Sequence, residues 1–191
     1  MVIFVKKAVL DACVIFPASI RDTLLSIASE GCFIPHWSQM IHNEWQRNLL
    51  KSRPDLTQDI LNKTSEIMDK CFHGSCFNDF HHVIEQIKLP DANDCHVLAL
   101  AITVGANFII TNNLKDFPKK ELSRYNIMAL TPDNFLVSLY EQFDMMVIEG
   151  VGKQRARLKN PSKTQDEFIN TLRNAGLVKF SNILESVKRE I

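Results

Sequence analysis

Short apolar runs recur at intervals along the chain. The run that ends in Asp11 shows no polar–apolar alternation, which is typical of a strand buried on both faces of a parallel sheet. The β-branched pair Ile109 and Ile110 favours the same structure in a later run. The runs predict strands at residues 8–11, 32–35, 108–111 and 127–130.

Between these runs, apolar residues recur every three or four positions, which is the period of a helix with one buried face. Ser38 and Asp91 are residue types that cap a helix N-terminus, and Pro17 and Pro54 favour a helix start. Strands that alternate with helices predict an α/β fold with a parallel sheet flanked by helices. The predicted helices are residues 17–31, 38–50, 54–72, 80–87, 92–104, 119–124 and 132–143.

The composition changes after about Asp144. Thr164 is a good N-cap, and the apolar positions that follow it predict a helical hairpin interrupted at Gly176. We therefore expect a first domain over residues 1–143 and a C-terminal helical extension over 144–191. The extension contains a basic linker without acidic residues, in which the cations are Lys153, Arg155, Arg157, Lys159 and Lys163.

The overall charge is balanced, with 22 Lys+Arg and 22 Asp+Glu. The molecule as a whole therefore has no positive field to attract a polyanion, and any nucleic-acid contact needs a local basic patch. The segment with Lys153, Arg155 and Arg157 is one candidate for such a patch. The alternative is an ordinary solvated linker.

The five cysteines are scattered and form no CxxC pair, which disfavours a disulfide framework or a structural zinc site. Lys6, Lys7 and Asp11 interrupt the apolar N-terminus, so it lacks the order of a signal peptide. No stretch approaches the ~20 apolar residues that a bilayer requires. We therefore expect a cytoplasmic protein without a membrane segment.

Acidic residues occupy the positions at which an α/β sheet assembles sites. Asp11 ends a strand, Asp94 begins a helix, and Asp116 follows a strand in the turn TNNLKDF. The carboxyl ends of parallel strands and the first turns of the following helices face one crevice. Carboxylates gathered there repel one another unless a cation neutralises them, and oxygen ligands suit Mg²⁺ or Mn²⁺. The pattern thus predicts a metal site.

Each candidate also has a purely structural interpretation. We expect Asp91 mainly to cap its helix and Asp94 mainly to bind the metal. Asp116 is of a type common in turns, and His96 is expected to be a packing residue. Thr111 and its neighbour Asn112 are candidate supporting residues, because a threonine at a strand end can hydrogen-bond a metal-binding carboxylate.

Three segments resemble the motifs of PIN-domain proteins: LDACVIFP, IHNEWQRNLL and PDANDCHVLALAI–GANFIITNNLKDFP. The resemblance covers roughly residues 8–143 and is closest to the long-form branch of the VapC-type toxins. It implies a metal-dependent endoribonuclease, often the toxin of a type II toxin–antitoxin pair. It also implies an RNA substrate, a small antitoxin partner and, in many members, a homodimer.

Under this resemblance, Asp11, Glu44 and Asp94 match the first three acidic positions of the family. Glu44 carries little weight without the resemblance, because a glutamate on a polar helix face is usually solvated. At the fourth position many members have aspartate two residues after the threonine, whereas this chain has Asn113. Asparagine still offers a neutral oxygen ligand, and Asp116 is expected to supply the missing charge.

Two alternatives remain open. Asn113 is compatible with a catalytically degenerate PIN domain that binds RNA or a protein partner without cleavage. A phosphatase that uses Asp11 as a nucleophile is a different class of enzyme. Such enzymes usually have a second acid two residues after the nucleophile, and this chain has Cys13 there.

Overall fold

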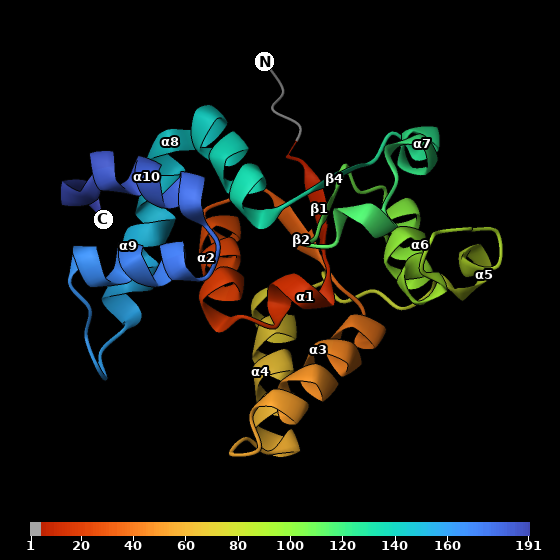
Figure 1. The fold of residues 1–191 in the computed structure, drawn as a ribbon, viewed down its shortest axis with the longest axis horizontal. Coiled ribbons are helices and arrows are strands. Elements are labelled where there is room, and N and C mark those ends of the chain that lie inside the picture. The colour runs from red at the N-terminus through yellow and green to blue at the C-terminus, as the bar shows by residue number, and fades with distance from the viewer. Residues whose placement is uncertain (1–4) are drawn as a thin grey trace. The chain divides into compact units, whose positions relative to one another are not determined.

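A computed structural model describes residues 5–191 (Figure 1). These residues form two compact units. The sheet unit consists of Lys6–Phe16 and Pro35–Leu130, and the helical unit includes Pro17–Ile34 and Thr131–Ile191. Each unit therefore combines segments that are distant in the sequence.

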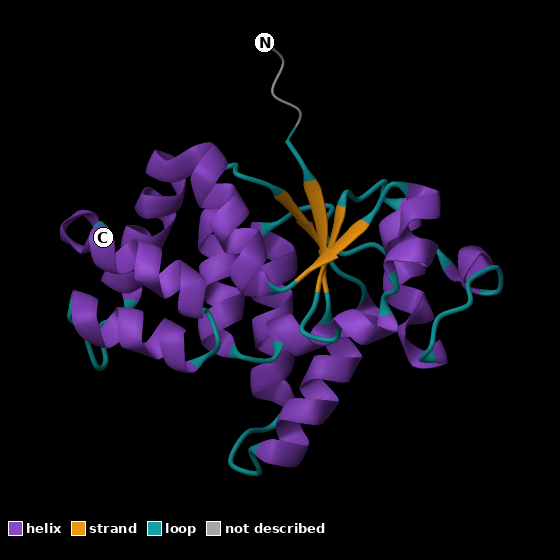
Figure 2. Cartoon of the chain, turned by 45° about the horizontal axis from the view of Figure 1, so that its top comes forward, coloured by secondary structure: helices purple, strands orange, loops and turns teal. Residues whose placement is uncertain are grey.

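The sheet has the order β2-β1-β3-β4, with β1 parallel to β3 and β3 parallel to β4. Figure 2 shows the four strands in orange, with helices of the sheet unit, in purple, beside them. The side chains of β1 and β3 are largely buried, which explains why their sequences are continuous apolar runs. The predicted α/β fold is thereby confirmed. The strands are β1 (Lys7–Leu10), β2 (Ile34–His36), β3 (Phe108–Ile110) and β4 (Met128–Leu130).

Helices of the sheet unit follow the predicted segments, with three differences. The four-residue helix at Ala12–Ile15 was not predicted. The second long helix begins at Gln58 rather than Pro54, because the Thr57 side chain accepts a hydrogen bond from the Ile60 backbone and caps it there. The amphipathic piece expected over residues 80–87 has only one helical turn. The helices are α1 (Ala12–Ile15), α3 (Gln39–Ser52), α4 (Gln58–Cys71), α5 (His81–Ile84), α6 (Cys95–Thr103) and α7 (Lys119–Leu122), with short 3₁₀ turns at Ala92–Asp94, Leu114–Asp116 and Ser123–Tyr125.

The helical unit consists of α2 (Ala18–Ser29), α8 (Pro132–Arg157), α9 (Gln165–Asn174), α10 (Val178–Ser186) and a final 3₁₀ turn at Lys188–Glu190. The helix α8 bends at Phe143, where the backbone is not helical, and then continues to Arg157. Most of the segment expected to be a basic linker is therefore helix. Gly150 lies within this helix, and a Cβ there would lie 3.0 Å from the Ser26 carbonyl of α2. This glycine permits close packing of two helices and does not end one.

The C-terminal hairpin follows its predicted pattern. Thr164 and Glu167 form a reciprocal capping box at the start of α9. Gly176 separates α9 from α10 with a φ of +100°, which a residue with a Cβ rarely adopts. The domain boundary between residues 143 and 144 stays a prediction. Within residues 5–191, no helix combines the length and apolar character that crossing a bilayer would require.

A buried hydrogen-bond network joins α3 to α4 inside the sheet unit. Trp45 Nε1 donates to His42 Nδ1 over 2.9 Å, and His42 Nε2 lies 3.2 Å from Asp69 Oδ1. The same carboxylate oxygen accepts a hydrogen bond of 2.7 Å from Trp37 Nε1. We call these four residues the tryptophan–histidine network. It gives every ring nitrogen of its buried aromatic side chains a partner.

Candidate functional site

A polar crevice of about 610 Å³ lies in the sheet unit. One wall is the exposed face of α3, and the other is the segment from Asp91 to His96 at the start of α6. Asn113, from the turn after β3, completes the lining. The lining residues are Met40, Asn43, Glu44, Arg47, Asn48, Asp91, Asn93, Asp94, His96 and Asn113.

Glu44 reaches this crevice because of the phase of α3. Ser38 caps the helix by accepting a hydrogen bond from the Ile41 backbone, which fixes where its first turn begins. Ile41 and Trp45 then face the core with no exposed surface. Glu44 lies on the opposite side, and its side chain is 31% exposed. A residue that is unremarkable in the sequence is thus placed among the crevice acids.

Asp11 is buried where β1 passes into α1. Its Oδ1 accepts a hydrogen bond of 2.7 Å from the Ala12 backbone. Its Oδ2 accepts one of 2.7 Å from the Thr111 hydroxyl and one of 3.2 Å from the Cys13 thiol. Both carboxylate oxygens are therefore held in place.

The turn after β3 is tied to the same carboxylate. Thr111 Oγ1, which donates to Asp11, accepts a hydrogen bond of 2.9 Å from the Asn113 backbone. The Asn112 backbone N–H donates to Cys13 Sγ over 3.3 Å, whereas the Asn112 residue itself is exposed. These contacts join the carboxyl ends of β1 and β3, which lie at the same edge of the parallel sheet.

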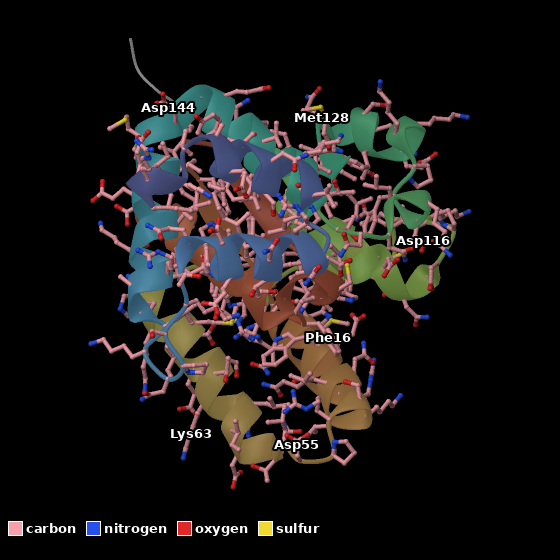
Figure 3. All side chains as sticks on the ribbon, turned by 60° about the vertical axis from the view of Figure 1, so that its left-hand side comes forward. Phe16, Asp55, Lys63, Asp116, Met128 and Asp144 are labelled. Carbon is pink, nitrogen blue, oxygen red and sulfur yellow. The ribbon has the colours of Figure 1, made fainter. Side chains whose placement is uncertain are left out.

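Asp116 belongs to the 3₁₀ turn that follows β3, and its position is labelled in Figure 3. It is buried, and its Oδ2 accepts a hydrogen bond from Asn113 Nδ2. Asp11, Thr111 and Asp116 do not line the crevice themselves. They are buried groups next to residues that do.

Asp94 is the electrostatic centre of the cluster. Its pKa is raised to about 6, mainly by burial and additionally by the negative charges of four neighbouring carboxylates. These neighbours are Asp11, Asp91, Asp116 and Glu44. Its Oδ2 is buried and has no hydrogen-bond partner among the described residues. Burial also raises the pKa of Asp11 despite its hydrogen bonds, and the charge of Glu44 adds to that effect. The ionised form of Asp94 is therefore disfavoured relative to that of a free aspartate, and a cation would offset this cost.

This arrangement fits a divalent metal ion. Buried polar atoms normally have a partner, so the buried Oδ2 of Asp94, which has none among the described residues, suits a bound ion. The surrounding donors are carboxylate and amide oxygens, which suit Mg²⁺ or Mn²⁺ better than softer metals. Asp91 has a local task, because its carboxylate accepts a hydrogen bond of 2.9 Å from the Asn93 backbone and caps the turn.

Three residues at the site were not predicted as functional from the sequence. His96 Nε2 lies 3.5 Å from Glu44 Oε2, while His96 Nδ1 is buried without a partner among the described residues. Arg47 lines the crevice one helical turn after Glu44. Cys13 contacts Asp11 directly. The spacing of Arg47 from Glu44 is a usable signal, because residues three apart share a helix face.

The cations of the expected basic patch lie in the helical unit and do not line the crevice. Lys153 Nζ lies 2.8 Å from both Glu30 Oε2 and Glu149 Oε1. Arg155 donates a hydrogen bond of 3.1 Å to the Lys163 carbonyl. Since two acids offset the charge of Lys153, an RNA-binding role of this segment stays a prediction.

Two segments of the chain match known protein families. Residues 7–115 match the PIN domain, and residues 132–186 match the VapC50 C-terminal domain. A segment of 61 residues is 48% identical to the putative ribonuclease VapC50 of Mycobacterium tuberculosis, covering 30% of this chain and 36% of that protein. The alignment thus spans little more than a third of the relative's length, and no solved structure gives a significant match. Because the PIN match covers more than half of the 191 residues and the acids of the crevice lie within it, the chain belongs to the PIN-domain family.

Proposed function

We propose that the protein is a metal-dependent endoribonuclease and the toxin of a type II toxin–antitoxin pair. The observation that carries the proposal is the buried Oδ2 of Asp94, which has no hydrogen-bond partner within residues 5–191 and is surrounded by four other carboxylates. Two comparisons support the same activity. One similar protein is named a putative ribonuclease, and the C-terminal part of the chain matches a VapC50 domain.

In this proposal Asp11, Asp94 and Asp116 hold Mg²⁺ or Mn²⁺. When bound, the ion lowers the pKa of a coordinated water and stabilises the alkoxide that leaves the phosphodiester. The protein's own contribution is to fix its ligands before the substrate arrives. Thr111 and Cys13 orient the Asp11 carboxylate, and Asn113 orients that of Asp116.

Glu44 is the proposed catalytic acceptor of the proton that the attacking water loses. Its side chain is the partly exposed carboxylate on the α3 wall, so its oxygens are accessible to water. His96 holds Glu44 from the opposite wall at 3.5 Å. The role of general base needs a carboxylate within reach of the attacking water, and an accessible Glu44 on the crevice wall supports that assignment.

The proposed regulation is inhibition by a small antitoxin protein that covers the crevice. Glu44, Asp91 and Asp94 form an acidic lining, which suits an Arg or Lys from that partner. Such a cation would replace the charge of the metal. A homodimer remains part of the proposal through the family resemblance alone.

A second candidate function is a PIN domain that binds RNA without cleaving it. The observation that favours it is Asn113, whose amide takes the position where many family members carry a fourth acid. Its side chain donates to Asp116, so the acid three residues later has an ordered place in the site. This contact favours the active enzyme over the degenerate one.

The deciding experiment measures cleavage of a defined single-stranded RNA with Mg²⁺ or Mn²⁺. Asp11→Asn and Asp94→Asn should each lower the rate by at least ~100-fold, because loss of a ligand costs more than loss of a group that supports one. Asp79→Asn is the matched control, since Asp79 is exposed and outside the crevice. Unchanged rates in both site variants would refute the mechanism, and tight binding of RNA without turnover would select the second candidate.

A further inference from the structure

The exposed face of α3 forms a largely polar stripe along the crevice, in which Met40 is the apolar member. Its members recur with the spacing i, i+3, i+4, i+7 and i+8, which keeps them on one side of a helix. At 1.5 Å per residue the stripe extends for about 12 Å. We call it the α3 stripe, and its residues are Met40, Asn43, Glu44, Arg47 and Asn48.

The charges of the crevice pose a problem for an RNA substrate. Among its lining residues Glu44, Asp91 and Asp94 are acidic, and Arg47 is the one lysine or arginine. A phosphodiester that enters this lining meets repulsion from the carboxylates. A bound metal ion offsets that repulsion at the scissile phosphate, but the neighbouring phosphates of the strand need a cation of their own.

Arg47 has the properties needed to bind a phosphate next to the scissile one. It is exposed, and within residues 5–191 it has no recorded hydrogen bond or ion pair with another side chain. Its guanidinium is therefore not committed to the fold. A guanidinium can bind two phosphate oxygens at once through paired N–H donors.

The rest of the stripe supplies neutral polar groups. Asn43 and Asn48 lie on either side of Arg47 along the helix, and Asn93 lies on the opposite wall. Asn43 Oδ1 accepts a hydrogen bond of 2.9 Å from Gln39, which orients its amide. Amides both donate and accept hydrogen bonds, so they can contact ribose hydroxyls and base edges that a single strand exposes.

We propose that the α3 stripe is the surface that holds the RNA strand, with Arg47 binding the phosphodiester next to the scissile one. Asn43 and Asn48 then contact the adjoining nucleotides. The inference rests on the proposed ribonuclease function and assigns a single-stranded RNA segment as the substrate. Arg47 touches substrate without taking part in the chemistry, so it should govern binding rather than turnover.

The test measures binding of a fluorescein-labelled single-stranded oligoribonucleotide by anisotropy over a series of KCl concentrations. An Asp94→Asn background prevents cleavage during the measurement. Adding Arg47→Gln should weaken binding by about tenfold and reduce the steepness of log K against log [KCl] by about 0.7, the value for one phosphate contact on a single strand. Arg47→Lys should keep the steepness and lose about threefold in affinity, because lysine retains the charge without the paired donors.

Lys63→Gln is the matched control. Lys63 is an exposed cation on α4 of the same unit, outside the crevice, and is labelled in Figure 3. Its removal should leave both affinity and salt dependence unchanged. In the cleaving protein, Arg47→Gln should raise KM with kcat within about twofold of the parent value.

Three results would overturn the inference. They are an Arg47→Gln variant with the parent's affinity and salt dependence, equal losses in Arg47→Gln and Lys63→Gln, and no measurable RNA binding by any variant. Failure of the proposed function has a different signature. In that case Asp11→Asn and Asp94→Asn leave cleavage unchanged, while the binding losses at Arg47 are still observed.

Discussion

The helix α3 carries two polar regions of opposite character on its two sides. On the buried side, His42 and Trp45 belong to the tryptophan–histidine network, in which each ring nitrogen has a partner. On the crevice side, Glu44 faces a cluster in which Asp94 Oδ2 is buried and has none among the described residues. The polar groups of the tryptophan–histidine network are thus satisfied within the fold, whereas Asp94 leaves one buried oxygen for a partner from outside.

Among the described residues, proximity of ligand-type atoms favours the tryptophan–histidine network and not the crevice acids. Atoms of His42, Asp69 and Cys76 lie within 4.8 Å of one another, which is close enough to hold a metal. However, Trp45 donates to His42 Nδ1, so the ring proton lies on Nε2 and points to Asp69. No lone pair of the imidazole is left for a metal. Burial lowers the pKa of His42 and raises that of the Cys76 thiol, so both are held in neutral forms.

The largest expected effect comes from breaking the satisfied region. Asp69→Leu removes the acceptor of Trp37 and His42, which leaves two N–H groups of fully buried rings without a partner. The free energy of unfolding should fall by about 2–4 kcal/mol, the cost of unsatisfied buried donors. Urea unfolding at pH 7 measures it. Glu66→Leu on the exposed face of the same helix is the control, and equal losses in both variants would contradict the interpretation.

Removing the charge of Asp94 from the crevice should increase the free energy of unfolding rather than lower it. Burial and neighbouring carboxylates raise the pKa of Asp94 from 3.8 to about 6. The folded state therefore disfavours the ionised form, and metal-free protein loses stability as the pH rises from about 4 through 6. In EDTA at pH 8, Asp94→Asn should be more stable than the parent by about 1 kcal/mol, a value discounted for partial exposure.

Two conditions sharpen this second prediction. Below pH 4 the difference between Asp94→Asn and the parent should disappear, because both side chains are then neutral. Added Mn²⁺ should stabilise the parent by about 2.7 kcal/mol at a hundred times the dissociation constant and leave the variant nearly unchanged. A parent protein that stays the more stable one in EDTA at pH 8 would show that the carboxylates do not repel as described.

The smallest effect concerns the contact between the walls of the crevice. His96→Leu removes the group 3.5 Å from Glu44, and we expect kcat to fall about fivefold with little change in KM. His96→Gln should restore most of the rate, because its amide N–H reaches the position of the imidazole Nε2. A purely packing role would give the reverse order, with the apolar leucine tolerated better. Combined with Glu44→Gln, the loss from His96→Leu should vanish.

Much of the fold was readable from short stretches of sequence. The strand that precedes Asp11 is indicated by the unbroken apolar residues 8–10, and Ser38 and Thr164 cap the helices that follow them. These signals are local, since each depends on residues within one or two turns of the chain. The acids of the site were also identifiable, because strand ends and helix starts of a parallel sheet share one edge.

What the sequence determined by itself was therefore the order of strands and helices and the candidate acids. Only the tertiary structure decided that α8 continues through Gly150, that His96 meets Glu44, and that Arg47 shares their crevice. The physical reason is that these contacts join segments far apart in the chain, where packing of whole helices sets which side chains meet. Gly150 illustrates it, because glycine is disfavoured within a helix, yet here the close approach of the α2 backbone leaves little room for a Cβ.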